Sequence, residues 1–269
     1  MIGFNYLGTL GQLGNQMFQY ASLKGIARKN GYNFCIPNHT KIFNDGLGNQ
    51  LRIELFEPFV LKNFNQLNAQ LIDGDRPVVQ EGTFEFNEGL FNNCPDWVSL
   101  WGFFQTEKYF KHIQDEIRED FTFNDDILEP CKEMMSQFEE APISLHIRRG
   151  DFLINSANHH NLGLDYYEKA LLEFPTNIPV LIFSDDPEWC SNQELFSDDR
   201  FLIAEGNSSY VDLCLMSLCE AHIIANSSFS WWGAWLANSE KVVAPSIWFG
   251  PNNAHLDTKD LYLDHWVKI

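Results

Sequence analysis

The chain has 269 residues, and 45% of them are hydrophobic, which is enough for a packed core and excludes a disordered chain. Its 37 Asp and Glu residues outnumber its 18 Lys and Arg residues, so the formal net charge is −19. That excess argues against nucleic acid or an anionic membrane surface as a general partner, and an anionic ligand would need a local basic site.

The N-terminal half is predicted to hold one strand, a glycine-bearing turn and three helices. These lie, in chain order, over 2–7, 8–15, 16–31, 108–121 and 124–138. From about 38 to 100 the pattern is irregular and predicts no element. We expect two domains, an N-terminal α/β domain over 1–140 and a C-terminal domain over 141–269.

In the C-terminal half, short apolar strands alternate with helices, as is typical of βαβ units in a parallel sheet. The strands are predicted over 143–148, 180–184, 200–204, 222–226 and 241–245, and the helices over 164–174, 210–221 and 228–238. Ligands of such sheets bind at the carboxyl ends of the strands. The residues that follow each strand are therefore the candidates for a site.

Six cysteines are scattered along the chain without CxxC spacing. We interpret them as reduced, mostly buried thiols of a cytoplasmic protein rather than as zinc ligands. The first residues do not join a basic segment to an apolar one, and no run approaches the ~18 apolar residues of a spanning helix. We therefore expect neither a signal peptide nor a membrane span.

Two adjacent arginines follow the strand at 143–148. Strand alternation places His146 and Arg148 on one face and Arg149 on the other. One guanidinium can then reach a ligand while its neighbour braces the loop, with Asp151 as a possible partner. A planar, permanently charged fork suits phosphate oxygens. A structural Arg–Asp network is an equally supported interpretation of this segment alone.

Polar residues also follow the strand at 180–184. A carboxylate of Asp185 or Asp186, next to Ser184, can accept two N–H bonds from a purine edge. The alternatives are a metal ligand or the N-cap of a helix that begins at Pro187, and capping is the default interpretation for one of the two aspartates.

A strand turns into a helix at the run Asn226, Ser227, Ser228, Phe229 and Ser230. Free backbone N–H groups at a helix N-terminus, together with hydroxyls, form an anion site. Simple N-capping by Ser227 or Ser228 explains one of the serines. The tryptophans of this helix are expected to pack in the core; they are Trp231, Trp232 and Trp235.

The N-terminal turn contains Gly11, Gly14, Asn15 and Gln16. Its GxxGNQ spacing is not the GxGxxG of a dinucleotide fingerprint. Side-chain amides here can orient a sugar hydroxyl or a leaving oxygen, and helix capping by Asn15 is the alternative.

Two further motifs have ordinary explanations. His159 and His160 could bind an acceptor, but adjacent histidines on a loop are usually solvated. Asp73-Gly74-Asp75 is similar to the DxD of metal-dependent sugar transferases, although a polar turn is the preferred interpretation. Together, the strand-end residues predict a nucleotide-sugar donor site that needs no divalent metal.

Seven segments in order resemble bacterial α-1,2-fucosyltransferases, glycosyltransferase family 11. They span 11–21, 102–110, 144–152, 166–171, 183–189, 212–237 and 242–249. The resemblance implies a GT-B-like α/β fold, with two Rossmann-like halves facing a cleft and the nucleotide held by the C-terminal half. It implies metal-independent, inverting transfer of fucose from GDP-β-L-fucose to the O2 of a terminal galactoside, in glycan, O-antigen or capsule synthesis.

Roles carried over from the resemblance fall on the same residues. Arg148 would grip the β-phosphate, with Asn15 near the reacting centre. Asp151 joins these two as the third expected catalytic residue, not from the resemblance but as a candidate base. The expected GDP-fucose contacts are His146, Arg148, Arg149, Ser184, Asp185, Asp186, Asn226, Ser227, Ser228, Phe229, Gly14 and Gln16. His160 and Gln105 are assigned to the acceptor. No general base is identified: Asp151 and His160 are candidates, and late proton loss without a base is an alternative.

Two other functions stay open. The chain could fucosylate a protein hydroxyl or a lipid-linked glycan, or it could be a non-catalytic module that binds a GDP-sugar or a glycan. Release of GDP on mixing GDP-fucose with lactose would separate the enzyme from the binder. Peripheral association with the inner face of a membrane is a further possibility, and the oligomeric state is open.

Overall fold

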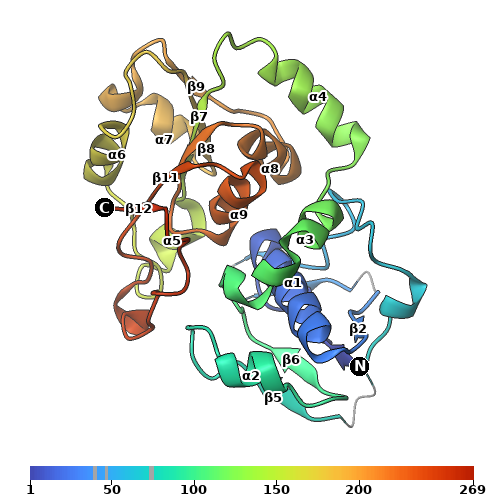
Figure 1. Cartoon of the computed structure of the whole chain (residues 1–269). Coiled ribbons are helices and arrows are strands. Elements are labelled where there is room, and N and C mark those ends of the chain that lie inside the picture. The colour runs from blue at the N-terminus through green and yellow to red at the C-terminus, as the bar shows by residue number, and fades with distance from the viewer. Residues whose placement is uncertain (39–40, 46–47, 73–75) are drawn as a thin grey trace. The chain divides into compact units, whose positions relative to one another are not determined.

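The structure, a computed structural model of the chain, describes residues 1–38, 41–45, 48–72 and 76–269. It divides into two compact units (Figure 1). Unit 1 comprises 1–122 and 256–263, and unit 2 comprises 123–255 and 264–269. The division thus lies at 122/123 in place of the expected 140/141. Helix α4, Asp125–Met135, packs with unit 2, where the buried Cys131 thiol lies 3.8 Å from the Val211 carbonyl of α8.

Unit 1 contains a four-stranded parallel sheet in the order β2-β1-β6-β5. Its strands are Phe34–Cys35, Ile2–Gly3, Ser99–Trp101 and Val78–Gln80. A separate antiparallel pair is formed by β3, Phe43–Asn44, and β4, Gln50–Leu51. The helices are α1, Leu13–Asn30, α2, Glu88–Asn93, and α3, Gln114–Asp120, with 3-10 turns at Gln66–Asn68, Glu107–Tyr109 and Lys111–Ile113.

Helix α1 confirms the predicted N-terminal helix, and Gly31 ends it in the left-handed conformation with φ 70°. It begins at Leu13, three residues before the expected start at 16, so the GxxGN motif lies partly inside the helix. The strand expected over 2–7 stops at Gly3, because residues 5–9 form a turn. The helix expected over 108–121 is broken into two 3-10 turns and α3.

Unit 2 contains a six-stranded parallel sheet in the order β12-β11-β10-β7-β8-β9. Its strands are Ile143–Ile147 (β7), Val180–Ser184 (β8), Phe201–Ile203 (β9), Ala221–Ile223 (β10), Lys241–Ala244 (β11) and Val267–Lys268 (β12). Numbered from β7, this is the 3-2-1-4-5-6 order of the Rossmann fold. Strands are added toward one edge of the sheet from β7 to β9 and toward the other edge from β10 to β12. Ligands of such sheets bind at the switch point between β7 and β10.

The helices of unit 2 confirm the predicted alternation, with two short helices added. They are α4, α5 (Gly150–Ile154), α6 (Leu164–Leu171), α7 (Pro187–Ser191), α8 (Ser209–Ser217) and α9 (Ser228–Ala237). The three tryptophans of α9 are at most 2% exposed, which confirms their place in the core. All six cysteines are buried and free, as expected.

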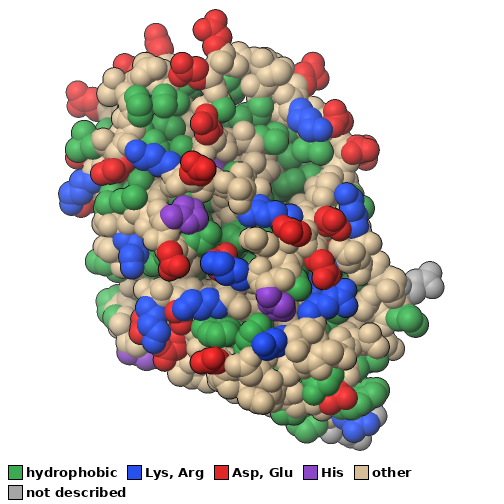
Figure 2. Space-filling model, viewed as in Figure 1, with side chains coloured by type: hydrophobic (Ala, Val, Ile, Leu, Met, Phe, Trp, Pro, Cys, Tyr) green, Lys and Arg blue, Asp and Glu red, His purple; other side chains and the backbone are tan. Residues whose placement is uncertain are grey.

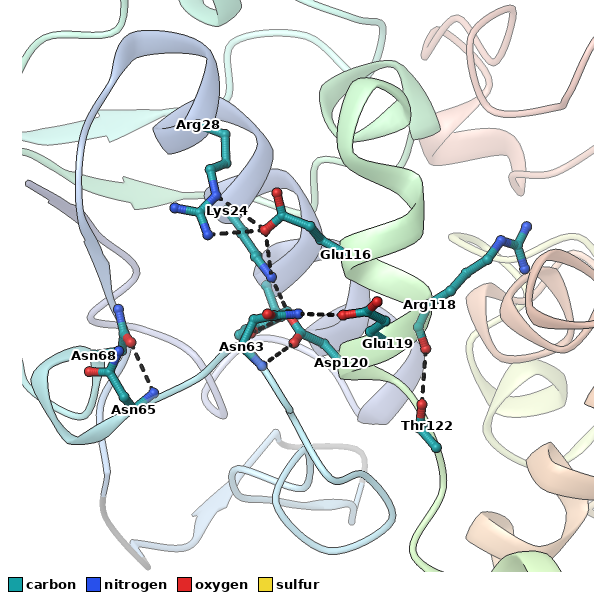
Figure 3. A network of polar contacts seen from close by, with 11 residues as sticks. Lys24, Arg28, Asn63, Asn65, Asn68, Glu116, Arg118, Glu119, Asp120 and Thr122 are labelled. Carbon is teal, nitrogen blue, oxygen red and sulfur yellow. Dashed lines mark hydrogen bonds and ion pairs between the residues drawn. The ribbon is translucent and has the colours of Figure 1, made fainter.

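A buried ion pair ties α1 to α3 within unit 1 (Figure 3). Lys24 Nζ lies 2.5 Å from Asp120 Oδ2, and both side chains are fully buried. Asp120 also accepts hydrogen bonds from the Tyr20 hydroxyl at 2.8 Å and from the Asn63 backbone N–H at 2.8 Å. Glu116 lies 3.3 Å from the same ammonium group. The network therefore fixes the helix whose first turn carries Asn15.

On the face drawn in Figure 2, Lys and Arg side chains lie interspersed with Asp and Glu. This mixed surface agrees with the argument from composition against a general polyanionic partner. In the described part of the chain, no helix is both long enough and apolar enough to span a membrane.

The buried His222 on β10 gives a prediction about pH. Its side chain is 1% exposed, and burial lowers its pKa to about 3. In the unfolded chain His222 is protonated below about pH 6.5, whereas in the folded chain it stays neutral down to a much lower pH. The free energy of unfolding therefore decreases as the pH falls below about 6.5. Relative to wild type, His222→Leu should gain about 1.4 kcal/mol of unfolding free energy for each pH unit between about 6.5 and 4.5.

Urea unfolding of both proteins at pH 7.0, 6.0 and 5.0 measures this difference directly. The comparison cancels the other titrating groups, including Asp212, whose pKa burial raises to about 6. A difference between wild type and variant that stays constant over this range would contradict the assignment of a neutral, buried His222.

Candidate functional site

The cluster at the ends of β7 and β8 is built around Arg148, which follows the last residue of β7. Its Nη1 lies 3.0 Å from Asp185 Oδ2, and its Nη2 lies 2.5 Å from Asp151 Oδ1. The guanidinium carbon is 5.4 Å from the centre of the Phe152 ring. The side chain is nevertheless 21% exposed. Arg148 is thus held in one orientation while part of its side chain stays accessible.

Arg149 contacts the same strand end. Its Nε lies 2.9 Å from Asp186 Oδ2, and its guanidinium carbon lies 3.9 Å from the centre of the Trp189 ring. Its backbone N–H donates to Asp185 Oδ1 at 2.8 Å. β7 ends at Ile147, before both arginines, so strand alternation does not decide where they point, and their expected placement on opposite faces stays a prediction. The structural Arg–Asp network offered as the alternative is present.

The two aspartates after β8 have different structural tasks. Asp186 caps α7 by accepting the Trp189 N–H at 3.2 Å, as the capping interpretation predicted for one of them. Ser184 Oγ accepts the Asp186 N–H at 3.0 Å. Gly150 makes room for Asp185, since a Cβ there would lie 2.5 Å from its Oδ2. Both carboxylates are thus engaged by arginines, and purine recognition by either stays a prediction.

His146, on β7, offers an unused polar atom beside this cluster. Its side chain is 5% exposed, and its ring centre lies 5.8 Å from that of Phe229. Burial, helped by the charge of Arg148, lowers its pKa to about 3, so the ring is neutral. Within the described residues, Nδ1 has no hydrogen-bond partner. A buried polar atom without a partner is costly, and a ligand hydrogen bond would remove that cost.

The first turn of α9 lies at the end of the β10 segment. Ser227 caps it by accepting the Phe229 N–H at 3.3 Å, so capping explains Ser227 and leaves Ser228 as the first helical residue. The Asn226 side chain is 3% exposed, and its Nδ2 donates to the carbonyls of His160 and Trp248, each at 2.8 Å. Asn226 therefore braces two loops, and its nitrogen is not offered to a ligand.

The histidine loop packs against the α5 segment through His159. His159 stacks on Phe152, with ring centres 4.0 Å apart and planes at 10°, and burial lowers its pKa. The interpretation of His159 as a solvated side chain was wrong. His160 is partly exposed, and its acceptor role stays a prediction.

In unit 1, the predicted residues Asn15 and Gln16 differ in what their side-chain amides contact. Asn15 is half-buried in the first turn of α1, and its Oδ1 accepts a hydrogen bond from Gln105 Nε2 at 2.6 Å. Gln12 holds the N-cap position, so capping by Asn15 was wrong. Gln16 is fully buried; its Nε2 donates to the Arg52 carbonyl at 2.7 Å, and its Oε1 accepts the Glu54 N–H at 2.9 Å.

Gln16 therefore uses its side-chain amide to anchor the 52–54 segment, and its expected contact with the donor stays a prediction. Gly14 is buried within α1. Among the residues that the structure describes, no group of three or more His, Cys, Asp or Glu side chains could hold a metal ion. Asp73-Gly74-Asp75 lies outside the described residues.

The model of the protein family described as "Glycosyl transferase family 11" matches residues 2–269. The chain belongs to glycosyl transferase family 11. It is 33% identical to an α-1,2-colitosyltransferase of Escherichia coli, with 96% of each chain covered. It is 24% identical to the galactoside α-(1,2)-fucosyltransferase 1 of Homo sapiens, over 96% of this chain and 73% of the relative.

Among solved structures, the chain resembles POFUT1 in complex with GDP-fucose, with a TM-score of 0.57 at 12% identity. The match covers 88% of this chain and 94% of that one. At this identity the likeness shows the fold alone. Together with the two parallel sheets, it confirms the predicted GT-B-like α/β class with two Rossmann-like halves.

Three residues of the arginine cluster were not predicted from the sequence: Gly150 makes room for Asp185, Phe152 lies beside Arg148, and Trp189 lies beside Arg149. Phe152 follows Asp151 directly and Trp189 lies three residues after Asp186, in the segments 144–152 and 183–189 that carry the resemblance. Their aromatic character in otherwise polar strand ends was the available signal, because guanidinium groups stack on aromatic faces.

Proposed function

We propose that this family 11 glycosyltransferase transfers L-fucose from GDP-β-L-fucose to the O2 of a terminal galactoside, with inversion at the anomeric carbon. Family membership and the human relative's name support the class of reaction. The name of a second Escherichia coli relative, 31% identical, supports a place in O-antigen synthesis. GDP-fucose and a β-galactoside glycan are the proposed substrates.

The observation that carries the proposal is the fixed, accessible Arg148 at the switch point of the unit 2 sheet. Departure of GDP from a fucosyl transition state builds negative charge on the β-phosphate. A guanidinium already held by Asp151 and Asp185 can stabilise that charge without reorganising, which is the main source of electrostatic catalysis. Asp151 then acts by holding Arg148, rather than as a free general base.

The start of α9 supports binding of the same diphosphate. This helix has ten residues, and the N–H groups of its first turn and the Ser228 hydroxyl are suited to phosphate oxygens. The neutral His146, with Nδ1 unpaired within the described residues, can hydrogen bond to the nucleoside beside Phe229. Because Arg148 and the helix terminus supply the positive charge, we propose that no divalent metal is required.

A second donor is favoured by one comparison. The 33% identical relative is named a colitosyltransferase, and colitose is L-fucose without its 3-hydroxyl group. A site that hydrogen bonds the 3-hydroxyl rejects the deoxy sugar strongly, whereas a site without such a contact accepts both. Donor preference is therefore decided by kinetics with the two GDP-sugars.

The test incubates the protein with GDP-fucose or GDP-colitose and a panel of β1,3- and β1,4-galactosides, in buffer containing EDTA. We expect release of GDP and a product whose NMR spectrum shows an α-linked fucose on O2 of galactose. A higher kcat/KM with GDP-colitose than with GDP-fucose would show that colitose, and not fucose, is the preferred donor sugar. No GDP release with either donor would favour the non-catalytic binding module, and loss of activity in EDTA would refute metal independence.

A further inference from the structure

A turn after β6 in unit 1 is held in a costly backbone conformation. Gly102 has φ 153°, and Phe104 has φ 53°, a left-handed conformation that non-glycine residues rarely adopt. Such conformations persist only where the surroundings fix them, and they cluster at functional sites. The side chains of Gln19 and Ser22 donate to the carbonyls of Gly102 and Phe104, at 3.1 Å each.

The carboxylate of Glu81 is the main brace of this turn. Its Oε2 accepts the Phe103 N–H at 2.7 Å, and its Oε1 accepts the Phe104 N–H at 2.9 Å. The turn is shaped around it, since a Cβ on Gly102 would lie 2.4 Å from the Glu81 Cβ. Burial raises the pKa of Glu81 to about 7 although both hydrogen bonds lower it. The chain thus holds a half-buried acid against two backbone amides.

The turn is followed directly by Gln105, which contacts the side-chain amide of Asn15 on α1. Gln105 follows Phe104, is 7% exposed, and donates through Nε2 to Asn15 Oδ1 at 2.6 Å. Gly11 lies on the other side, where a Cβ would come within 2.2 Å of Asn15 Nδ2. With Oδ1 engaged by Gln105, the Asn15 amide is fixed with its nitrogen as the group that can donate.

We propose that Glu81 is a positioning residue for glycosyl transfer, holding the 102–105 turn so that Gln105 fixes the Asn15 amide with its nitrogen toward the substrate. This rests on the proposed glycosyl transfer and on the place near the reacting centre that the family resemblance gives Asn15. Asn15 donates a hydrogen bond to a substrate oxygen, and Glu81 acts on it through the turn. Small misplacement of a positioned group is enough to cost about 10²-fold in rate.

The isosteric variant Glu81→Gln tests this. Its amide offers one acceptor oxygen, and its NH₂ group opposes the second backbone N–H, so the turn loses its brace without a change in side-chain volume. We expect kcat to fall at least about tenfold while the Kd for GDP stays unchanged. The matched control is Glu88→Gln, an exposed glutamate in the first turn of α2, which should keep wild-type kinetics.

A double-mutant cycle with Gln105→Ala separates positioning from a general loss of structure. If Glu81 acts through Gln105, Glu81→Gln should cost nothing further in the Gln105→Ala background. The Asn15 side-chain amide resonances should also shift in Glu81→Gln and not in Glu88→Gln. Should Glu81→Gln fail to fold, Glu81→Asp is the second variant: it keeps the charge but is one methylene shorter, so it cannot reach both backbone N–H groups and should also lower kcat.

An unchanged kcat in Glu81→Gln, or an equal loss in both backgrounds, would overturn the inference. The amide resonances report on the Glu81–Asn15 connection in the absence of turnover. If the wild-type protein releases no GDP from any donor, the proposed function is wrong. If the Asn15 side-chain amide resonances do not shift in Glu81→Gln, only this inference is wrong.

Discussion

Arg148→Ala is expected to lower kcat by roughly 10²–10³-fold, equivalent to a barrier about 2.7–4 kcal/mol higher. The reason is electrostatic: the variant loses the cation that meets the charge developing on the β-phosphate. The fold should survive, because Asp151 and Asp185 are 19% and 24% exposed and water can solvate them once the guanidinium is gone. Steady-state kinetics with GDP-fucose and a galactoside, together with the melting temperature, measure both effects.

The matched control for this variant is Arg200→Ala. Arg200 immediately precedes β9, at the opposite end of the same sheet, and its guanidinium packs on Phe201. That variant should keep wild-type kcat. Arg148→Lys keeps the charge but loses the planar fork and should recover only part of the rate. A folded Arg148→Ala protein with near-wild-type turnover would refute the role of Arg148.

The largest effect on stability is expected for Asp120→Ala. Removing this carboxylate takes away the Lys24 partner at 2.5 Å and leaves the buried ammonium only the partly exposed Glu116 at 3.3 Å among the partners described. It also deprives Tyr20 and Asn63 of their acceptor. Breaking a buried pair by removing one partner costs roughly 3–5 kcal/mol. Urea unfolding at pH 7 should show a loss of that size in the free energy of unfolding.

Asp115→Ala provides the comparison, because this aspartate is exposed on the same helix α3. Its effect should stay within about 0.5 kcal/mol. Similar stabilities for the two variants would show that the Lys24–Asp120 pair is not the buried ionic contact drawn in Figure 3.

The C-terminal half could be predicted from sequence because its strands are short, continuous apolar runs. Residues 143–147 and 180–183 are buried on both faces, so their pattern and the helices between them identified the sheet. The strand Val267–Lys268 was missed, since two exposed residues carry no periodicity. Unit 1 was harder to predict, because its strands have two or three residues and the turns between them depend on distant partners.

The candidate site, like the fold, could be predicted from the sequence only in part. Residue types placed the arginines, aspartates and serines at the strand ends, and the structure brings Arg148, Arg149, Asp151, Asp185 and Asp186 together. Sequence could not show that Gln16 binds the 52–54 backbone or that Asn226 braces two loops, because these contacts join segments far apart in the chain. An amide used within the fold and an amide offered to a ligand look alike in sequence.

The most direct test of the central claim is calorimetry of GDP and GMP binding to wild type and to Arg148→Ala. If Arg148 meets the β-phosphate, wild type should bind GDP more tightly than GMP. The variant should still bind both nucleotides but with a clearly smaller preference for GDP, because the start of α9 remains. Failure of wild type to bind GDP, or an equal preference for GDP in both proteins, would contradict the account.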